Sequence, residues 1–290
     1  MTRNNKPILV TGSHRSGSTW VGQMLSLSRE VKYVSEPFNP GYGLKIFKSW
    51  FTYINSINEE YYTKDIVKLL KFQGNYRLNL PAFRYWSNIF YPLSKRPLIK
   101  DPIACFSSDW LAKKFNMQVV VLWRHPVAFY ASLKRLNWHF DFSNFLSQKN
   151  LMTSHLEPLK DLIAKENKSY AQEAATLWLC IYSVLDKYLT NNPSWLSKRH
   201  EDISQNPLNE FRDLYQKLDL EFSKKIERKI RQYSSGKNYE PTKVLALKRD
   251  SSSVAKEWQK HIDQEEINII KNITGNLALK YYPENEWLKK

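Results

Sequence analysis

The chain contains very little cysteine. Cys105 and Cys180 are its only cysteines in 290 residues, and there is no Cys-x-x-Cys motif and no Cys/His cluster. A structural zinc site and a disulfide framework are therefore excluded as the basis of the fold. At this length the chain can bury a sizeable apolar core and form one large α/β domain.

Long apolar runs are also missing. The most apolar segment, residues 174–189, is interrupted by Ser183, Asp186 and Lys187, which is typical of a core helix rather than a membrane span. Residues 1–7 are polar and basic and contain no apolar signal region. We expect a cytoplasmic protein without a transmembrane segment.

Acidic residues are outnumbered by basic ones. The chain has 28 Asp and Glu against 44 Lys and Arg, a formal net charge of +16. This excess favours polyanionic partners such as a nucleotide, a nucleic acid, an anionic glycan or a membrane surface. Because no recognised nucleic-acid-binding motif is present, no specific nucleic-acid partner is expected. A non-enzymatic polyanion-binding protein stays open as one alternative.

Residues 8–20 predict a phosphate-binding turn. An apolar run typical of a buried strand is followed by small residues and by a helix expected from Ser18. That arrangement points backbone N–H groups and a helix N-terminus at an anion. Gly12 and Gly17 have the spacing of a Walker A motif, but Ser18 replaces its lysine and Arg15 is the nearest cation. A P-loop kinase or NTPase is therefore the weaker alternative.

Three further apolar runs end in polar residues. They lead to Glu36, Lys100 and Arg124, and Ser132 follows Arg124 within the next predicted helix. Continuous apolar runs are typical of parallel strands buried on both faces, and ligands bind at the carboxyl edge of such sheets. The alternation of strands and helices predicts an α/β three-layer sandwich, with a central parallel sheet flanked by helices.

Residues 12–20 resemble the 5′-phosphosulfate loop of sulfotransferases, which use 3′-phosphoadenosine 5′-phosphosulfate (PAPS). In that family a Lys or Arg is followed by Ser-Gly-[ST]-[ST], often with Trp next. An Arg at a strand end with a Ser eight residues later is similar to the family's 3′-phosphate site. The resemblance implies a P-loop NTPase-like fold, a single sulfotransferase domain over residues 1–290, PAPS as co-substrate, PAP as product and no metal. It assigns co-substrate binding to Arg15, Ser16, Gly17, Ser18, Thr19, Trp20, Arg124 and Ser132, with Trp20 either stacked on adenine or part of the core.

The resemblance also implies catalytic residues. Some carbohydrate-type sulfotransferases carry a Glu-Pro after the loop, in which the Glu is the base, and Glu36 precedes a proline here. His14 is the competing base, because imidazole titrates near neutrality. Lys100, in a Lys-Asp-Pro segment similar to the same class, and Arg15 are expected to stabilise charge during in-line transfer of a sulfuryl group to an acceptor hydroxyl.

Two other assignments rest on weaker similarity. His200 stands where the family commonly has a Tyr near adenine, and Lys248, Arg249 and Ser251 lie in a basic segment similar to the loop that closes the nucleotide site. Residues 40–95 are rich in aromatic residues and are interpreted as a helical insertion near the acceptor site. The acceptor is expected to be a saccharide or a glycolipid, with a lipid or phenolic alcohol left open.

Overall fold

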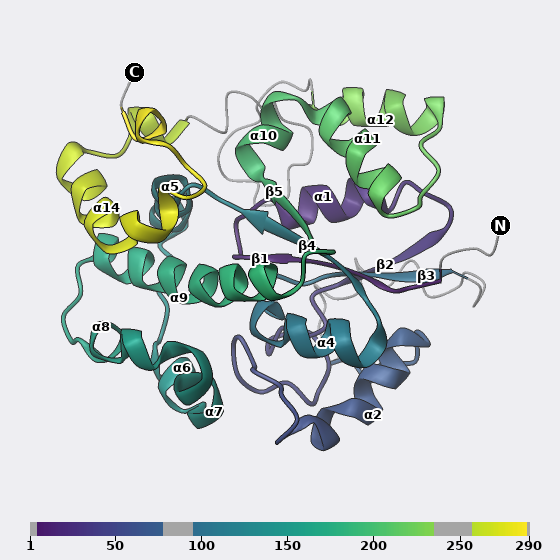
Figure 1. The fold of residues 1–290 in the computed structure, drawn as a ribbon, viewed down its shortest axis with the longest axis horizontal. Helices are drawn as coiled ribbons and strands as arrows, with labels where there is room; N and C mark the ends of the chain where they lie inside the picture. The colour runs from purple at the N-terminus through teal and green to yellow at the C-terminus, as the bar shows by residue number, and fades with distance from the viewer. Residues whose placement is uncertain (1–4, 78–94, 235–256, 289–290) are drawn as a thin grey trace.

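A five-stranded parallel sheet forms the centre of the molecule. The computed structural model describes residues 5–77, 95–234 and 257–288. The strand order is β2-β3-β1-β4-β5, and every neighbouring pair is parallel (Figure 1). The strands are β1 Ile8–Gly12, β2 Val31–Ser35, β3 Arg96–Lys100, β4 Gln118–Trp123 and β5 Leu196–Arg199. The predicted α/β architecture is confirmed.

The central strands bury both of their faces. In β4, Val120 and Leu122 join one apolar cluster, whereas Val119 and Val121 join the other. Side chains alternate between the two faces of a strand, so a strand covered on both sides needs apolar residues at every position. This requirement explains why the sequence of β4 shows a continuous apolar run rather than an alternating pattern.

Four helices cover one face of the sheet, above it in Figure 1. Helix α11 shows why they pack there, since Phe211, Leu214 and Tyr215 recur at helical spacing and are all buried in the cluster that contains Ile8 and Val10. The four helices are α1 Ser18–Leu25, α10 His200–Gln205, α11 Pro207–Lys217 and α12 Lys224–Ser234.

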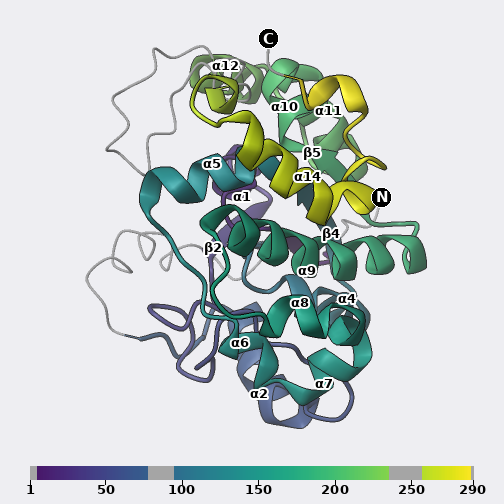
Figure 2. The ribbon, with the colours of Figure 1, turned by 90° about the vertical axis from the view of Figure 1, so that its left-hand side faces the viewer.

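Other helices, among them the long helix α9, cover the opposite face, and Figure 2 shows α9 passing close to α5 and α14. Helix α9 begins with a capping box between Ser169 and Gln172, which satisfies backbone groups at its start. The main helices of this layer are α2 Glu59–Leu70, α4 Ser108–Phe115, α5 Pro126–Leu136, α9 Tyr170–Asn191 and α14 Gln264–Ala278. Short elements fill the connection from α5 to α9: α6 Ser143–Leu146, α7 Lys149–Leu151, a π-helical turn Met152–Leu156, a 3-10 turn Glu157–Leu159 and α8 Lys160–Ala164. Further 3-10 turns are Cys105–Ser107, Glu257–Lys260 and Glu284–Glu286.

The aromatic-rich segment contributes both buried and exposed rings. Phe47 and Phe51 are buried in the same apolar cluster as Val119 and Val121 of β4, so they stabilise the core on that face of the sheet. Tyr61 of α2, in contrast, is 60% exposed. Residues 78–94 of this segment lie outside the described residues. The interpretation of residues 40–95 as an insertion near the acceptor site therefore stays a prediction.

The core contains no covalent crosslink from the two cysteines of the chain. Cys105 and Cys180 are both free and buried, and burial raises the pKa of both thiols. Among the helices of the described ranges, none is both long enough and apolar enough to cross a bilayer.

Candidate active site

The turn between β1 and α1 requires glycine at two positions. At Gly12 φ is 145° and an added Cβ would lie 2.3 Å from the Leu122 carbonyl oxygen; at Gly17 φ is 84° and a Cβ would lie 2.3 Å from Nδ1 of His200. Gly17 precedes α1, which has no side-chain cap and no acidic residue in its first turn. The positive end of α1 is therefore not neutralised locally, which is the arrangement that an anion-binding turn needs.

Tyr182 of α9 ties this turn to the sheet. Its hydroxyl donates to the Leu122 carbonyl at 2.9 Å, lies 2.9 Å from Oγ of Ser13 and accepts the Ser13 N–H at 3.4 Å. The Tyr182 ring also stacks on Trp123, with centroids 4.5 Å apart. Such buried bonds are stronger than the same bonds in water, so they hold the turn in register with β4. Nothing in the sequence singled out Tyr182 beyond its place in an apolar helix.

Arg15 links the turn to α5. Its Nε donates to Oγ of Ser132 at 2.8 Å, and its guanidinium lies 5.6 Å from the ring centroid of Trp138. From the sequence, Arg15 was assigned to the 5′ end of the ligand and Ser132 to the 3′-phosphate. The structure brings the two side chains into direct contact, so an anion held by one of them lies close to the other.

Arg124 is buried where β4 ends, with 7% of its surface exposed. Its Nε lies 3.6 Å from Oε1 of Glu201, a carboxylate that also accepts the His125 N–H at 3.1 Å and the Tyr282 hydroxyl at 3.0 Å. Nε of Arg124 has no hydrogen-bond partner among the described residues. A buried guanidinium compensated by one carboxylate is a rigid donor group for a second anion. Sequence reasoning did not identify Glu201 as the residue that positions Arg124.

Glu36 and Lys100 form an ion pair at the ends of β2 and β3, in which Lys100 is buried and Glu36 is partly buried. The Glu36 carboxylate also accepts hydrogen bonds from the Tyr42 hydroxyl and, at 3.0 Å, from Nδ2 of Asn39. Burial by itself raises the pKa of Glu36, but the Lys100 charge and the hydrogen bonds from Lys100, Tyr42 and Asn39 outweigh it, so the pKa lies below its usual range. Glu36 is therefore ionised at neutral pH. Tyr42 and Asn39 follow shortly after the Glu-Pro in sequence, but no local pattern indicated their contact with it.

His14 lies in an aromatic pocket. Its ring centroid is 5.1 Å from that of Phe129 and 5.9 Å from that of Phe51. Burial lowers the pKa of His14 to about 4, and the charge of Arg15 adds to this effect. The imidazole is therefore neutral at physiological pH. Its Nδ1 has no hydrogen-bond partner in the described part of the chain, so a bound hydroxyl could pair with it.

These groups open onto one cavity of about 1020 Å³. Its charged lining consists of Arg15, Lys100, Arg124, Arg135, Glu36 and Asp141, four cations against two carboxylates. The volume is at the upper end of the range for ligand sites, so a nucleotide and a second molecule fit together. The predicted residues that line this cavity are His14, Arg15, Gly17, Ser18, Thr19, Trp20, Glu36, Lys100, Arg124, Ser132 and His200.

The remaining predicted residues are placed differently. Ser16 is buried under the turn, close to Gly12, and its side chain does not line the cavity, so it shapes the turn. Trp20 meets His200 edge to face at 6.1 Å and also packs against Phe211 of the core, so its ring belongs to both the cavity wall and the apolar layer. Lys248, Arg249 and Ser251 lie outside the described residues.

A glycine turn after the central strand, at the carboxyl edge of a parallel sheet, defines a P-loop-like α/β protein. Residues 7–224 match the model of the Sulfotransferase family, and the chain belongs to that family.

The solved structures that match this chain are distant from it in sequence. The sulfotransferase domain from the curacin biosynthetic pathway is 15% identical with a TM-score of 0.54, over 96% of this chain and 99% of that chain. Mouse sulfotransferase SULT7A1 complexed with PAP is 12% identical with a TM-score of 0.45, over 97% and 87%. Sulfotransferase STF9 from Mycobacterium avium is 12% identical with a TM-score of 0.49, over 97% and 78%. The similarity to the curacin-pathway domain supports the fold alone. No curated protein matches the sequence.

Proposed function

We propose that this sulfotransferase takes its sulfuryl group from PAPS and transfers it by in-line displacement to a hydroxyl of a saccharide or glycolipid. One observation carries the proposal: the lysine-less glycine turn, the Arg124 and Ser132 side chains and the Glu36–Lys100 pair all line the same cavity. The proposal includes a cytoplasmic location, where PAPS is available.

Unpartnered polar atoms in the site fit an adenosine nucleotide. Nε1 of Trp20, Nδ1 of His200 and Nε of Arg124 are buried without hydrogen-bond partners in the described ranges, although buried polar groups normally have one. PAPS, when bound, supplies the sulfuryl group and three anionic centres. Gly17 and the start of α1 would hold its 5′ end, Arg124 and Ser132 its 3′-phosphate, and Trp20 with His200 its adenine.

Glu36 would accept the proton of the acceptor hydroxyl. In the structure Lys100 pairs with this carboxylate and holds its pKa low, which makes Glu36 a weak base. An anion bound at the turn would compete for the Lys100 ammonium. As Lys100 turns toward that anion, the pKa of Glu36 rises and the carboxylate becomes a better base. Lys100 and Arg15 would then stabilise charge that develops on the leaving side.

The aromatic wall of the cavity supports a saccharide acceptor. Trp50 and Trp138 both line it and are 40% and 43% exposed. The face of an indole ring carries partial negative charge and attracts the slightly positive C–H groups on the face of a sugar. Nδ1 of His14 and the Tyr42 hydroxyl could hydrogen-bond to sugar hydroxyls beside these rings.

Radiolabelled PAPS tests the proposal directly. The purified protein is incubated with labelled PAPS and separate panels of glycans, glycolipids, simple lipids and phenols, and labelled products are separated from PAP. We expect label on a glycan or glycolipid. Label on phenols alone would contradict the acceptor class, and absence of transfer together with absence of PAP binding by calorimetry would reject PAPS-dependent transfer.

A further inference from the structure

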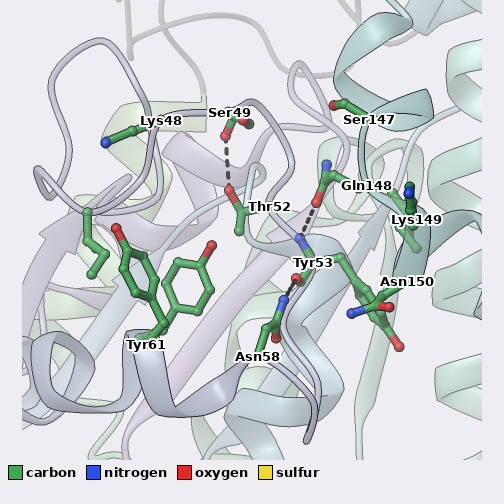
Figure 3. Close-up of a pocket in the computed structure, with 13 residues that line it drawn as sticks. Lys48, Ser49, Thr52, Tyr53, Asn58, Tyr61, Ser147, Gln148, Lys149 and Asn150 are labelled. Atoms are coloured by element: carbon green, nitrogen blue, oxygen red, sulfur yellow. Dashed lines mark hydrogen bonds between the residues drawn. The ribbon is translucent and has the colours of Figure 1, made fainter.

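A second cavity of about 450 Å³ lies between the start of α2 and α7, on the side of the molecule away from α12 (Figures 2 and 3). Ser49, Thr52 and Tyr53 contribute to one wall, Tyr61 and Tyr62 to another, and the segment from Ser147 to Leu151 to a third. None of the catalytic or co-substrate residues discussed above lines it. Its size falls within the range of small-molecule sites.

The charged groups of this cavity are all positive. Lys48 and Lys149 line it, and no Asp or Glu does. Figure 3 shows the two lysines on opposite sides of the pocket. Neither ammonium has an ion-pair partner among the described residues, although surface lysines often pair with nearby carboxylates. Two unneutralised cations around one concave site favour an anionic ligand.

Two tyrosine rings, Tyr61 and Tyr62, also line this cavity. Tyr61 is largely exposed, and it meets Tyr62 edge to face with centroids 4.9 Å apart. Tyr62 in turn stacks on the buried ring of Phe47 at 5.5 Å, which fixes its orientation. A tyrosine ring can pack on a sugar ring while its hydroxyl hydrogen-bonds to the sugar. When neighbouring side chains already fix the ring, little side-chain entropy is lost on binding.

The second cavity shares a wall with the first. Trp50 lines the first cavity, whereas Ser49, the next residue along the chain, lines the second. On the neighbouring α6–α7 segment, Asn144 lines the first cavity and Gln148 lines the second. Two hydrogen bonds join residues 49–53 to the α6–α7 segment. The Trp50 N–H donates to Asn144 at 3.2 Å, and the Tyr53 N–H donates to Gln148 at 2.8 Å. Because neighbouring Cα atoms are only about 3.8 Å apart, a chain of a few sugar rings can reach both cavities.

We propose that the second cavity is a distal subsite that binds an anionic sugar unit of an extended acceptor, while another unit of the same chain is sulfated in the first cavity. This inference rests on the proposed function and narrows its acceptor to an acidic oligosaccharide or polysaccharide. Lys48 and Lys149 would bind the carboxylate or sulfate groups of that unit, and Tyr61 its ring face.

Binding without turnover tests the subsite by itself. The probe is a galacturonic-acid tetrasaccharide, compared with neutral maltotetraose, and affinity is measured by calorimetry in the absence of PAPS. We expect the acidic probe to bind more tightly than the neutral one, with an affinity that falls as salt rises. Lys48→Ala/Lys149→Ala should weaken it by about tenfold, because each exposed charge pair contributes modestly. Tyr61→Ala should weaken binding, whereas Tyr61→Phe should retain it.

The matched control removes two positive charges from α2, outside both cavities. Lys64 and Lys68 are exposed on that helix and line neither cavity, so Lys64→Ala/Lys68→Ala should bind the tetrasaccharide like the unaltered protein. Equal losses in the two double variants, or equal affinity for the acidic and neutral probes, would overturn the subsite.

Turnover separates this inference from the proposed function. With labelled PAPS, the Lys48→Ala/Lys149→Ala variant should raise KM for acidic tetrasaccharides several-fold and leave kcat and the affinity for PAP unchanged. Acidic disaccharides, too short to reach both cavities, should show little change. Transfer that is insensitive to both lysines would overturn the subsite and leave the proposed function intact. Specific binding at the subsite without any sulfuryl transfer would support the subsite and reject the proposed function.

Discussion

Arg15 is the cation of the glycine turn, which lacks the Walker lysine, and its hydrogen bond to Ser132 fixes the direction of its side chain. We expect Arg15→Ala to slow turnover by about 10²-fold, as with loss of an oxyanion-stabilising donor. Arg15→Lys should recover only part of this rate, since one ammonium cannot reproduce the planar fork of donors. Steady-state assays with PAPS check this, and Arg228→Ala, an exposed charge on α12, is the control. A normal rate for Arg15→Ala would remove Arg15 from the mechanism.

The ionisation of Glu36 makes the stability of the protein depend on pH. Its folded-state pKa lies below the usual 4.5, so its ion pair with Lys100 stabilises the protein above that value and is lost as pH falls through the folded pKa. We expect Glu36→Gln to inactivate the enzyme and to lower the free energy of unfolding by about 3 kcal/mol, because Lys100 is left buried and unpaired.

The double variant Glu36→Gln/Lys100→Met separates these two effects. It removes both charges, so it should recover much of the lost stability in urea unfolding while staying inactive. Recovery of activity in the double variant would exclude Glu36 as the base.

At the scale of elements, the start of α1 depends on Gly17 and its neighbour His200 of α10. Gly17→Ala should destabilise the protein by about 1–2 kcal/mol through its left-handed backbone, and by more through contact with the imidazole. In a His200→Ala background only the backbone cost remains, so the loss should be smaller. A double-mutant cycle by urea unfolding measures the difference. Equal losses in both backgrounds would mean that the imidazole moves aside freely.

The Lys-Asp-Pro segment after β3 is similar to a catalytic segment, but its aspartate stabilises the fold. Asp101 follows Lys100 in the Lys-Asp-Pro segment, yet its carboxylate accepts backbone N–H groups of Phe38 at 2.7 Å, Ile103 at 2.8 Å and Ala104 at 3.2 Å. It is fully buried and does not line the cavity. Asp101 therefore connects the loops after β2 and β3 and holds the neighbouring Lys100 in place.

At the scale of the whole molecule, a ligand that binds only the folded chain raises its stability. At one hundred times its Kd, PAP should stabilise the fold by about 2.7 kcal/mol, which corresponds to a rise in Tm of about 5 °C. ATP with Mg²⁺ at the same concentration should produce a smaller rise, because a site without the Walker lysine is not built for its terminal phosphate. Thermal denaturation with each ligand checks this, and a larger rise with ATP would favour the NTPase alternative.

The sequence by itself determined the four apolar strands β1 to β4, the glycine turn and the polar residues that follow these strands. These features follow from local rules, since burial on both faces demands continuous apolar runs and a turn with positive φ demands glycine. The resemblance to sulfotransferases at residues 12–20 and at Arg124 with Ser132 was carried by the same short segments, and the family is confirmed.

Only the tertiary structure decided which side chains meet. Arg15 bonds to Ser132 across 117 residues, and Tyr182 reaches Ser13 across 169. Glu201 compensates Arg124, and a second cavity forms where α2 approaches α7. Such pairings depend on strand order and on how helices pack over the sheet, and these are set by the packing of the whole core rather than by any local pattern of residues.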